Sequence, residues 1–149
     1  MGSQVNLSKI STIFEGVGET ISKSPDFKKV PIKWGMIEVT PNTMPPTLVV
    51  LEAKPFEYDV TGCCYERQLD IIIIHNTNQE REIFLRLTKY SESLIELLKE
   101  YSLTINYDLQ FLQGSDIYAL RNNREDSESY KGAKTDFSSM IVLTYMLRY

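Results

Sequence analysis

The sequence predicts an α+β domain with a mixed, mainly antiparallel sheet and two main helices packed on one of its faces. Residues 136–149 alternate like a long strand, and residues 63–75 form a second long strand-like stretch before the only long helical pattern. Along the chain, the order helix, two strands, long strand occurs twice, which is typical of an α+β plan. A thirteen-residue strand reaches about 43 Å, and a domain of this length is about 40 Å across. The sequence therefore predicts long β-ribbons that cross the domain or project beyond it.

The length and apolar content suit one domain covering residues 1–149. The chain has 149 residues, of which 42% are hydrophobic, and this is enough for a single core. A polar stretch, residues 121–135, lies within that domain. It contains one aromatic residue and one alanine as its only apolar side chains, so it cannot offset its ordering entropy by burying itself.

The first helix is predicted over residues 7–22. Apolar side chains recur at three- and four-residue spacing, at Leu7, Ile10, Phe14, Val17 and Ile21. Gly16 and Gly18 each weaken a helix by up to about 1 kcal/mol. We therefore expect a neighbouring surface to hold this helix in place.

Three strands are expected next, over residues 33–39, 47–54 and 63–75. The proline-rich loop 40–46 separates the first two, and Pro55 is expected to end the second before a turn over residues 56–62. The third strand is amphipathic at its start and apolar on both sides over residues 71–74, so that end is expected to be covered twice.

The second helix is the clearest element, predicted over residues 78–101. Thr77 and Glu80 have the spacing of a capping box at its start. Its predicted buried stripe comprises Ile83, Leu87, Tyr90, Leu94, Leu97 and Tyr101, and Glu92, Glu96 and Lys99 are expected to face outward. Short strands over residues 104–112 and 117–120, separated by a turn over 113–116, precede the polar stretch and the final strand.

Composition excludes several classes of protein. Twenty carboxylates outnumber sixteen basic side chains, which argues against a phosphate-backbone binder. No run of eighteen apolar residues is present, so we expect no membrane contact, and the N-terminus has no signal-peptide pattern. Cys63 and Cys64 are adjacent, so in a strand they would point to opposite faces, which is poor geometry for a disulfide or shared metal site.

Candidate chemistry is sparse, so the sequence predicts that the protein is not an enzyme and has no cofactor, catalytic residue or metal site. His75, the only histidine, is interpreted as a polar strand-end residue because no partner lies at metal-ligand or catalytic spacing. The acidic run at residues 124–128 lies in the polar stretch, whereas catalytic groups need rigid support. Trp34 and the nine tyrosines leave room for a binding surface, because aromatic residues are enriched at interfaces.

Element order and texture resemble those of bacteriophage tail terminator and tail completion proteins. The similarity covers residues 7–149 and is carried by LSKISTIFEGVGETI, MPPTLVVLEAK, YERQLDIIIIHNT, REIFLRLTKYSESLIELLKEY and FSSMIVLTYMLRY. It depends on the sequence of elements and not on an invariant motif, and that family offers no catalytic residues to transfer.

The resemblance implies a homo-oligomeric ring, usually hexameric, that caps the tail tube, ends its polymerisation and meets the head–tail connector or neck protein. Such a protein is made in the host cytoplasm and resides in the virion at the tail–neck junction. DNA would pass through the lumen without specific binding, since six chains would carry about 24 negative charges. Contacts with another subunit or the tube are expected in the polar stretch, at Arg121, Arg124, Glu125, Asp126, Glu128, Tyr130, Lys131 and Lys134.

Two alternatives stay open. A neck or head-completion protein belongs to the same structural class and shares the α+β plan. A ferredoxin-like domain that binds a small ligand or regulator would instead be a monomer with a deep pocket and convergent polar groups.

Overall fold

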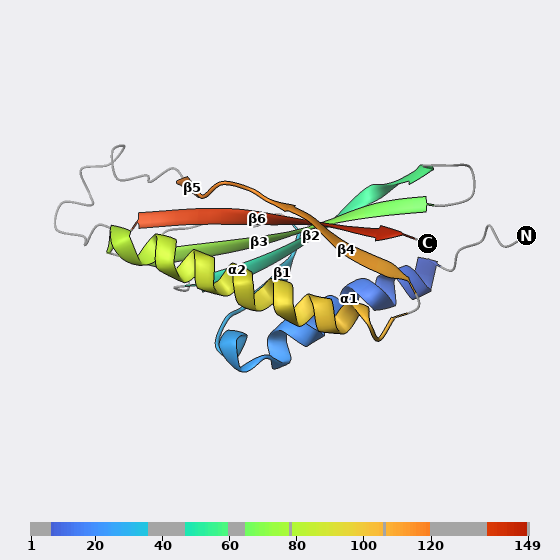
Figure 1. Cartoon of the computed structure of the whole chain (residues 1–149), viewed down its shortest axis with the longest axis horizontal. Coiled ribbons are helices and arrows are strands. Elements are labelled where there is room, and N and C mark those ends of the chain that lie inside the picture. Colours follow the sequence, from blue (N-terminus) through green and yellow to red (C-terminus); the bar gives the residue numbers. More distant parts are fainter. Residues whose placement is uncertain are drawn as a thin grey trace, which may run out of the picture.

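The α+β prediction is confirmed by the computed structural model, which describes residues 7–35, 47–59, 65–77, 79–105, 107–119 and 137–148 (Figure 1). In chain order the elements are α1 (Leu7–Lys23), the 3-10 turn η1 (Pro25–Phe27), β1 (Ile32–Trp34), β2 (Thr47–Asp59), β3 (Tyr65–Thr77), α2 (Glu80–Ser102), β4 (Asp108–Gly114), β5 (Tyr118–Ala119) and β6 (Phe137–Arg148).

One mixed sheet contains all the described strands, in the order β1-β2-β3-β6-β4, with β5 also paired to β6. The pairing of β1 with β2 is parallel and every other pairing is antiparallel. β6, the last strand in sequence, lies between β3 and β4. The mainly antiparallel sheet therefore has β1 and β2 at one edge and β4 and β5 at the other.

The long strands are paired within the chain, so the expectation of projecting ribbons is not confirmed. β3 pairs with β2 on one side and with β6 on the other, from Glu66↔Arg148 to Thr77↔Phe137. β6 is covered on its other side by β4 and β5. Between those two short strands, the amide of Ser115 donates to the carbonyl of Val142 at 2.8 Å, and the Val142 amide donates to the Ser115 hydroxyl at 2.9 Å.

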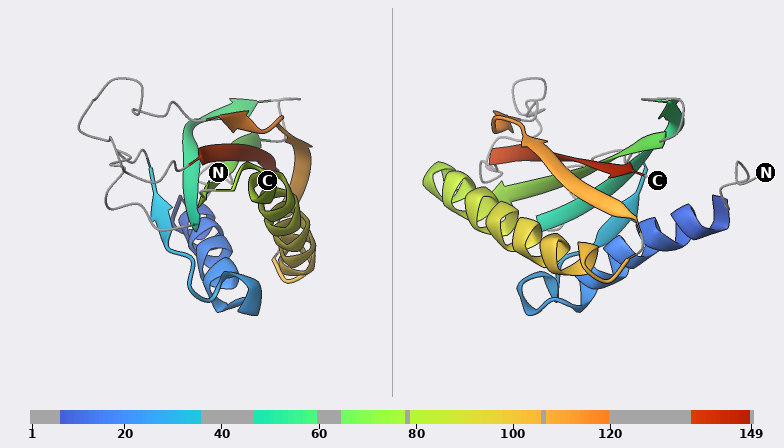
Figure 2. Two further views of the ribbon diagram at one scale, coloured as in Figure 1. Left: turned by 90° about the vertical axis from the view of Figure 1, so that its left-hand side faces the viewer. Right: turned by 45° about the vertical axis from the view of Figure 1, so that its right-hand side comes forward.

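Both helices pack on the same face of the sheet, as predicted (Figure 2). Alternate residues of the two central strands point toward the helices. Leu69, Ile71 and Ile73 of β3 and Leu143, Tyr145 and Leu147 of β6 are buried there, and the helices contribute the opposite wall of the core. The largest fully buried side chains are Phe27, Ile10, Ile21, Leu51, Leu69, Ile71, Ile73, Leu87, Leu94, Leu98, Leu143 and Leu147.

α1 extends one residue beyond its predicted end, and Ile10, Phe14, Val17 and Ile21 of the predicted stripe are buried together with Ile13. Its two glycines face neighbours, as expected. A Cβ built on Gly16 would lie 2.9 Å from Cζ of Tyr101 on α2, and one built on Gly18 would lie 3.3 Å from Cδ1 of Leu51. The missing side chains let α1 approach α2 and the sheet closely.

The prediction that Pro55 ends the second strand is wrong, because β2 continues to Asp59. The ladder with β3 is irregular between Ala53 and Glu57, and β1 pairs only with Val49–Leu51. At Pro55, therefore, no described strand requires a hydrogen bond from the backbone amide, which a proline cannot donate. The strand passes through the proline as an edge segment.

The predicted capping box between Thr77 and Glu80 is also wrong, because Thr77 is not the N-cap residue of α2. Gln79 is the N-cap of α2 and makes no side-chain cap bond. The hydroxyl of Thr77 instead accepts from the amide of Gln79 at 3.2 Å and donates to the carboxylate of Glu82 at 3.2 Å. β3 extends to Thr77, so this threonine is a strand residue and not a cap.

The buried stripe of α2 is rotated slightly from the prediction. Ile83, Leu87 and Leu94 are buried as expected and Leu98 joins them, whereas Tyr90, Leu97 and Tyr101 are half-buried against the first helix and η1. Glu92, Glu96 and Lys99 are exposed, as predicted.

The remaining strand boundaries differ by a few residues. β4 begins at Asp108, since residues 103–105 complete the end of α2, and it includes Gly114, which was predicted to lie in a turn. β1 covers only the start of the strand predicted over 33–39, and residues 36–39 lie outside the described residues. The final strand matches its prediction within one residue at each end.

Candidate interaction surfaces

The predicted contact residues cannot be placed. Arg121, Arg124, Glu125, Asp126, Glu128, Tyr130, Lys131 and Lys134 all lie outside the described residues. The described residues that flank them, Ala119 and Phe137, belong to adjacent strands, because β5 pairs with β6 through Ala119↔Ser139. The contacts expected from these eight residues stay a prediction.

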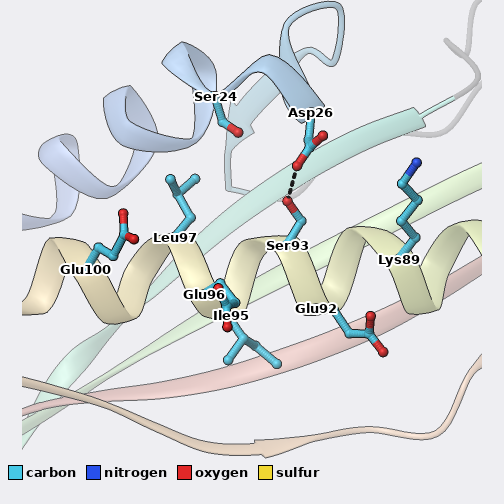
Figure 3. Close-up of a pocket in the computed structure, with 9 residues that line it drawn as sticks. All are labelled: Ser24, Asp26, Lys89, Glu92, Ser93, Ile95, Glu96, Leu97 and Glu100. Carbon is cyan, nitrogen blue, oxygen red and sulfur yellow. Dashed lines mark hydrogen bonds between the residues drawn. The ribbon is translucent and has the colours of Figure 1, made fainter.

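An open groove of about 750 Å³ runs along α2 beside the end of α1 and η1 (Figure 3). At its centre the hydroxyl of Ser93 donates to the carboxylate of Asp26 at 2.5 Å. Glu92, Glu96 and Glu100 also line the groove, and all three are exposed. Figure 3 shows Glu92 pointing away from Asp26, so these carboxylates do not converge on a point where a ligand would be held.

A row of buried polar side chains crosses three strands on the helix-facing side of the sheet. Thr47, His75 and Ser139 occupy one register, Thr47↔His75 and His75↔Ser139, and all three are buried. The Thr47 hydroxyl lies 2.9 Å from Nδ1 of His75, and the ring of Tyr90 lies 6.3 Å away. His75 is therefore an internal strand residue, and its interpretation as a strand-end residue is wrong.

Thr47, His75 and Ser139 include the hydroxyl and imidazole groups of a catalytic triad, but their arrangement does not suit its chemistry. The group on Nδ1 of His75 is a hydroxyl, which cannot stabilise an imidazolium as a carboxylate does. A substrate would also have to reach Ser139 through the sheet or the core. A structural role, satisfying a polar position inside the sheet, fits the geometry better.

The face of the sheet away from the helices is divided into two halves. At one end Leu48, Val50 and Ile74 form a small apolar cluster with Ile72 and Met140. At the other end the Lys54 ammonium lies 3.0 Å from Glu52 and 3.5 Å from Asp70. The hydrogen bond with Glu52, and the charges of the two carboxylates, raise the pKa of Lys54 above its ordinary value although partial burial opposes the shift.

The edge formed by β4 and β5 is rich in exposed apolar side chains. Phe111, Leu112 and Tyr118 are 39%, 46% and 51% exposed. Phe111 also packs on Tyr145, with ring centroids 5.4 Å apart, so its position is fixed from inside. No described residue pairs with the outer side of β4. This edge therefore presents backbone hydrogen-bonding groups and apolar area together.

The opposite edge carries another exposed aromatic residue, Trp34 of β1. Its indole is 47% exposed and lies against α1, because a Cβ built on Gly18 would be 3.6 Å from its Cζ2 atom. Trp34 was recognisable in the sequence as a possible contact. The other edge was not, because a pair such as Phe111 and Leu112 is equally typical of a buried strand.

Comparisons with known proteins add no relatives: no protein-family model and no curated protein matches the chain. Among the described residues, no three histidine, cysteine or acidic side chains gather where they could hold a metal ion. No helix in the described part of the chain is long and apolar enough to cross a membrane.

Proposed function

We propose that this chain is a structural assembly protein that forms a ring on the end of a phage-type tail tube. By its resemblance to tail terminator proteins, the proposed ring is hexameric. The ring ends tube polymerisation and forms the junction with the head or neck. The proposal is supported by the resemblance in element order and, above all, by the exposed apolar edge of β4 and β5.

The structure changes the physical argument for assembly. The long strands β3 and β6 find their hydrogen-bonding partners inside the chain. Strand addition between subunits is therefore left to the outer strands. No described strand pairs with the outer side of β4, where Phe111 and Leu112 are exposed. Partner strands commonly add to such an edge, where main-chain bonds supply affinity and side-chain pockets supply specificity.

The direct test is a tube-length assay. Tail-tube subunits from the same genome are polymerised with and without this protein, and tube lengths and ends are measured by electron microscopy. We expect shorter tubes with ring-shaped density at one end. Leu112→Glu should weaken capping because it places a charge in the apolar edge, whereas Leu103→Glu, at an exposed position at the end of α2, should cap normally. Unchanged tube lengths with bare ends would contradict the proposal.

The same preparation separates the alternatives. Binding to head connectors but not to tubes would favour a neck or head-completion protein. A monomer that binds neither tubes nor head connectors, and whose melting temperature rises when a small molecule is added, would favour a ligand-binding domain. The open groove beside Asp26 is where such a ligand would be sought first.

A further inference from the structure

The segment that contains β1 and the segment that contains β4 and β5 have opposite charge. Between Tyr107 and Ala119, the segment that forms β4 and β5, there are two aspartates and no basic residue. Between Lys28 and Gly35, the segment that leads into and includes β1, there are three lysines and no acidic residue. The five charged side chains are Asp108, Asp116, Lys28, Lys29 and Lys33, and all are exposed. None forms a salt bridge with a described residue.

Each edge also presents exposed aromatic or aliphatic area beside its charges. Trp34 lies next to Lys33 on the basic edge, and Phe111 and Leu112 follow Asp108 on the acidic edge. Aromatic residues are enriched at protein–protein contacts, and complementary charges around such contacts favour the correct partner. The Lys28–Gly35 segment and the β4–β5 segment are thus complementary in charge and alike in apolar character.

Strand direction makes the two edges compatible. β1 runs parallel to β2, and antiparallel pairings then follow through β3, β6 and β4, so β4 runs opposite to β1. A rotation about an axis along the strands preserves these directions. It would place β4 of one copy antiparallel to β1 of the next, with the helices of both copies on the same side of a continuous sheet.

From these observations we infer that the occupant of the β4–β5 edge is a second copy of this chain, docked head to tail through its Lys28–Gly35 segment. This inference rests on the proposed function and names the contact that would close the ring. A two-fold contact between two β4–β5 edges, centred on Leu112, would instead place Asp108 of each copy opposite Asp116 of the other, and these carboxylates repel. A head-to-tail contact closes into a ring when its rotation allows.

A charge exchange tests this contact. One variant, Asp108→Lys with Asp116→Lys, makes both edges basic; the other, Lys29→Glu with Lys33→Glu, makes both edges acidic. Sedimentation velocity at about 50 mM salt, where charges are weakly screened, measures the self-association of each variant and of their equimolar mixture. We expect each variant alone to associate at least about tenfold more weakly than the wild type, and the mixture to recover association because unlike edges meet again.

Matched controls carry the same change in net charge elsewhere. Glu92→Lys with Glu96→Lys, and Lys89→Glu with Lys99→Glu, alter exposed positions on α2 and should associate like the wild type. Recovery in the mixture also shows that both edge variants are folded.

Three results would overturn the inference. The first is that the edge variants associate as strongly as the control variants. The second is that the equimolar mixture does not recover self-association. The third is that the wild type stays monomeric both alone and on tube ends. If tubes are still capped in any of these cases, the proposed function stands and only this contact is wrong. If tubes are not capped while the charge exchange behaves as expected, the head-to-tail contact stands and the proposed function is wrong.

Discussion

The hydroxyl of Tyr101 on α2 donates a 2.8 Å hydrogen bond to the backbone carbonyl of Ile13 on α1. The bond is possible because Gly16, one turn further along α1, has no side chain to displace the tyrosine ring. It connects the two helices through residues that are 88 positions apart in the sequence. The glycine that weakens α1 in isolation is therefore what allows it to dock.

Gly16→Ala should destabilise the protein by about 1–3 kcal/mol, the usual cost of overpacking, although alanine is the better helix former. The new Cβ would lie 2.9 Å from Cζ of Tyr101 and even closer to its hydroxyl, so the ring must leave its bond to Ile13. Urea unfolding measures the change. Gly18→Ala is the matched control, since its nearest contact would be 3.3 Å, and it should cost less. If Gly16→Ala is equally harmful in a Tyr101→Ala background, steric conflict with the ring is not the cause.

Tyr145→Phe and Tyr101→Phe should have opposite effects on stability. The Tyr145 side chain is only 2% exposed, and its hydroxyl has no hydrogen-bond partner among the described residues. Removing that hydroxyl should stabilise the protein by about 1 kcal/mol, because an unpaired buried polar group is lost. Removing the Tyr101 hydroxyl should cost about 1 kcal/mol, because a formed bond is lost. Equal destabilisation of both variants in urea would show that Tyr145 has a partner.

Stability should fall in alkaline solution. Burial raises the pKa of the Tyr145 hydroxyl well above its ordinary value, and burial followed by the charge of Glu19 raises that of Tyr101. Above about pH 10, where an unfolded tyrosine ionises, the unfolded chain loses protons that the folded chain retains. The free energy of unfolding therefore decreases as pH rises from about 10 toward the folded-state pKa values. Urea titrations at pH 8 to 11 should show a smaller decrease for Tyr145→Phe than for the wild type; identical slopes would rule out Tyr145 as a contributor.

Thr47→Val should destabilise the sheet by about 1–3 kcal/mol, because it leaves Nδ1 of the buried His75 without the hydroxyl 2.9 Å away. Valine keeps the shape and the strand preference of threonine, so the hydrogen bond is the main change. Thr104→Val serves as the control, since its hydroxyl bonds to the carbonyl of Tyr101 at an exposed position. It should cost no more than about 0.5 kcal/mol. Thermal unfolding compares the two, and equal losses would show that burial of the Thr47–His75 pair contributes nothing.

The sequence predicted the elements well where one periodicity dominated. The apolar spacing of α1, the stripe of α2 and the alternation of β6 each determined an element to within a few residues. Prediction failed where tertiary context decided the outcome. Pro55 does not end β2 because the described neighbours leave that part of the strand unpaired, and Thr77 does not cap α2 because it belongs to β3.

The candidate surfaces were less accessible to sequence reasoning. His75 is separated by 28 residues from Thr47, and only the strand register brings them together. The charge difference between the two edges is visible in the sequence, but its meaning depends on which strands are outermost. That order was hidden because β6, distant in sequence from β3, inserts beside it.

The insertion of β6 between β3 and β4 also affects how the chain folds during its synthesis. During synthesis every other described strand leaves the ribosome first, yet β3 and β4 have no common neighbour until residues 137–148 emerge. The pairing of Glu66 with Arg148 then closes a loop of 82 residues. Such distant pairings slow folding, and until they form the nascent chain exposes an apolar strand that invites aggregation. Chaperone protection should therefore matter most during the interval just before β6 is complete.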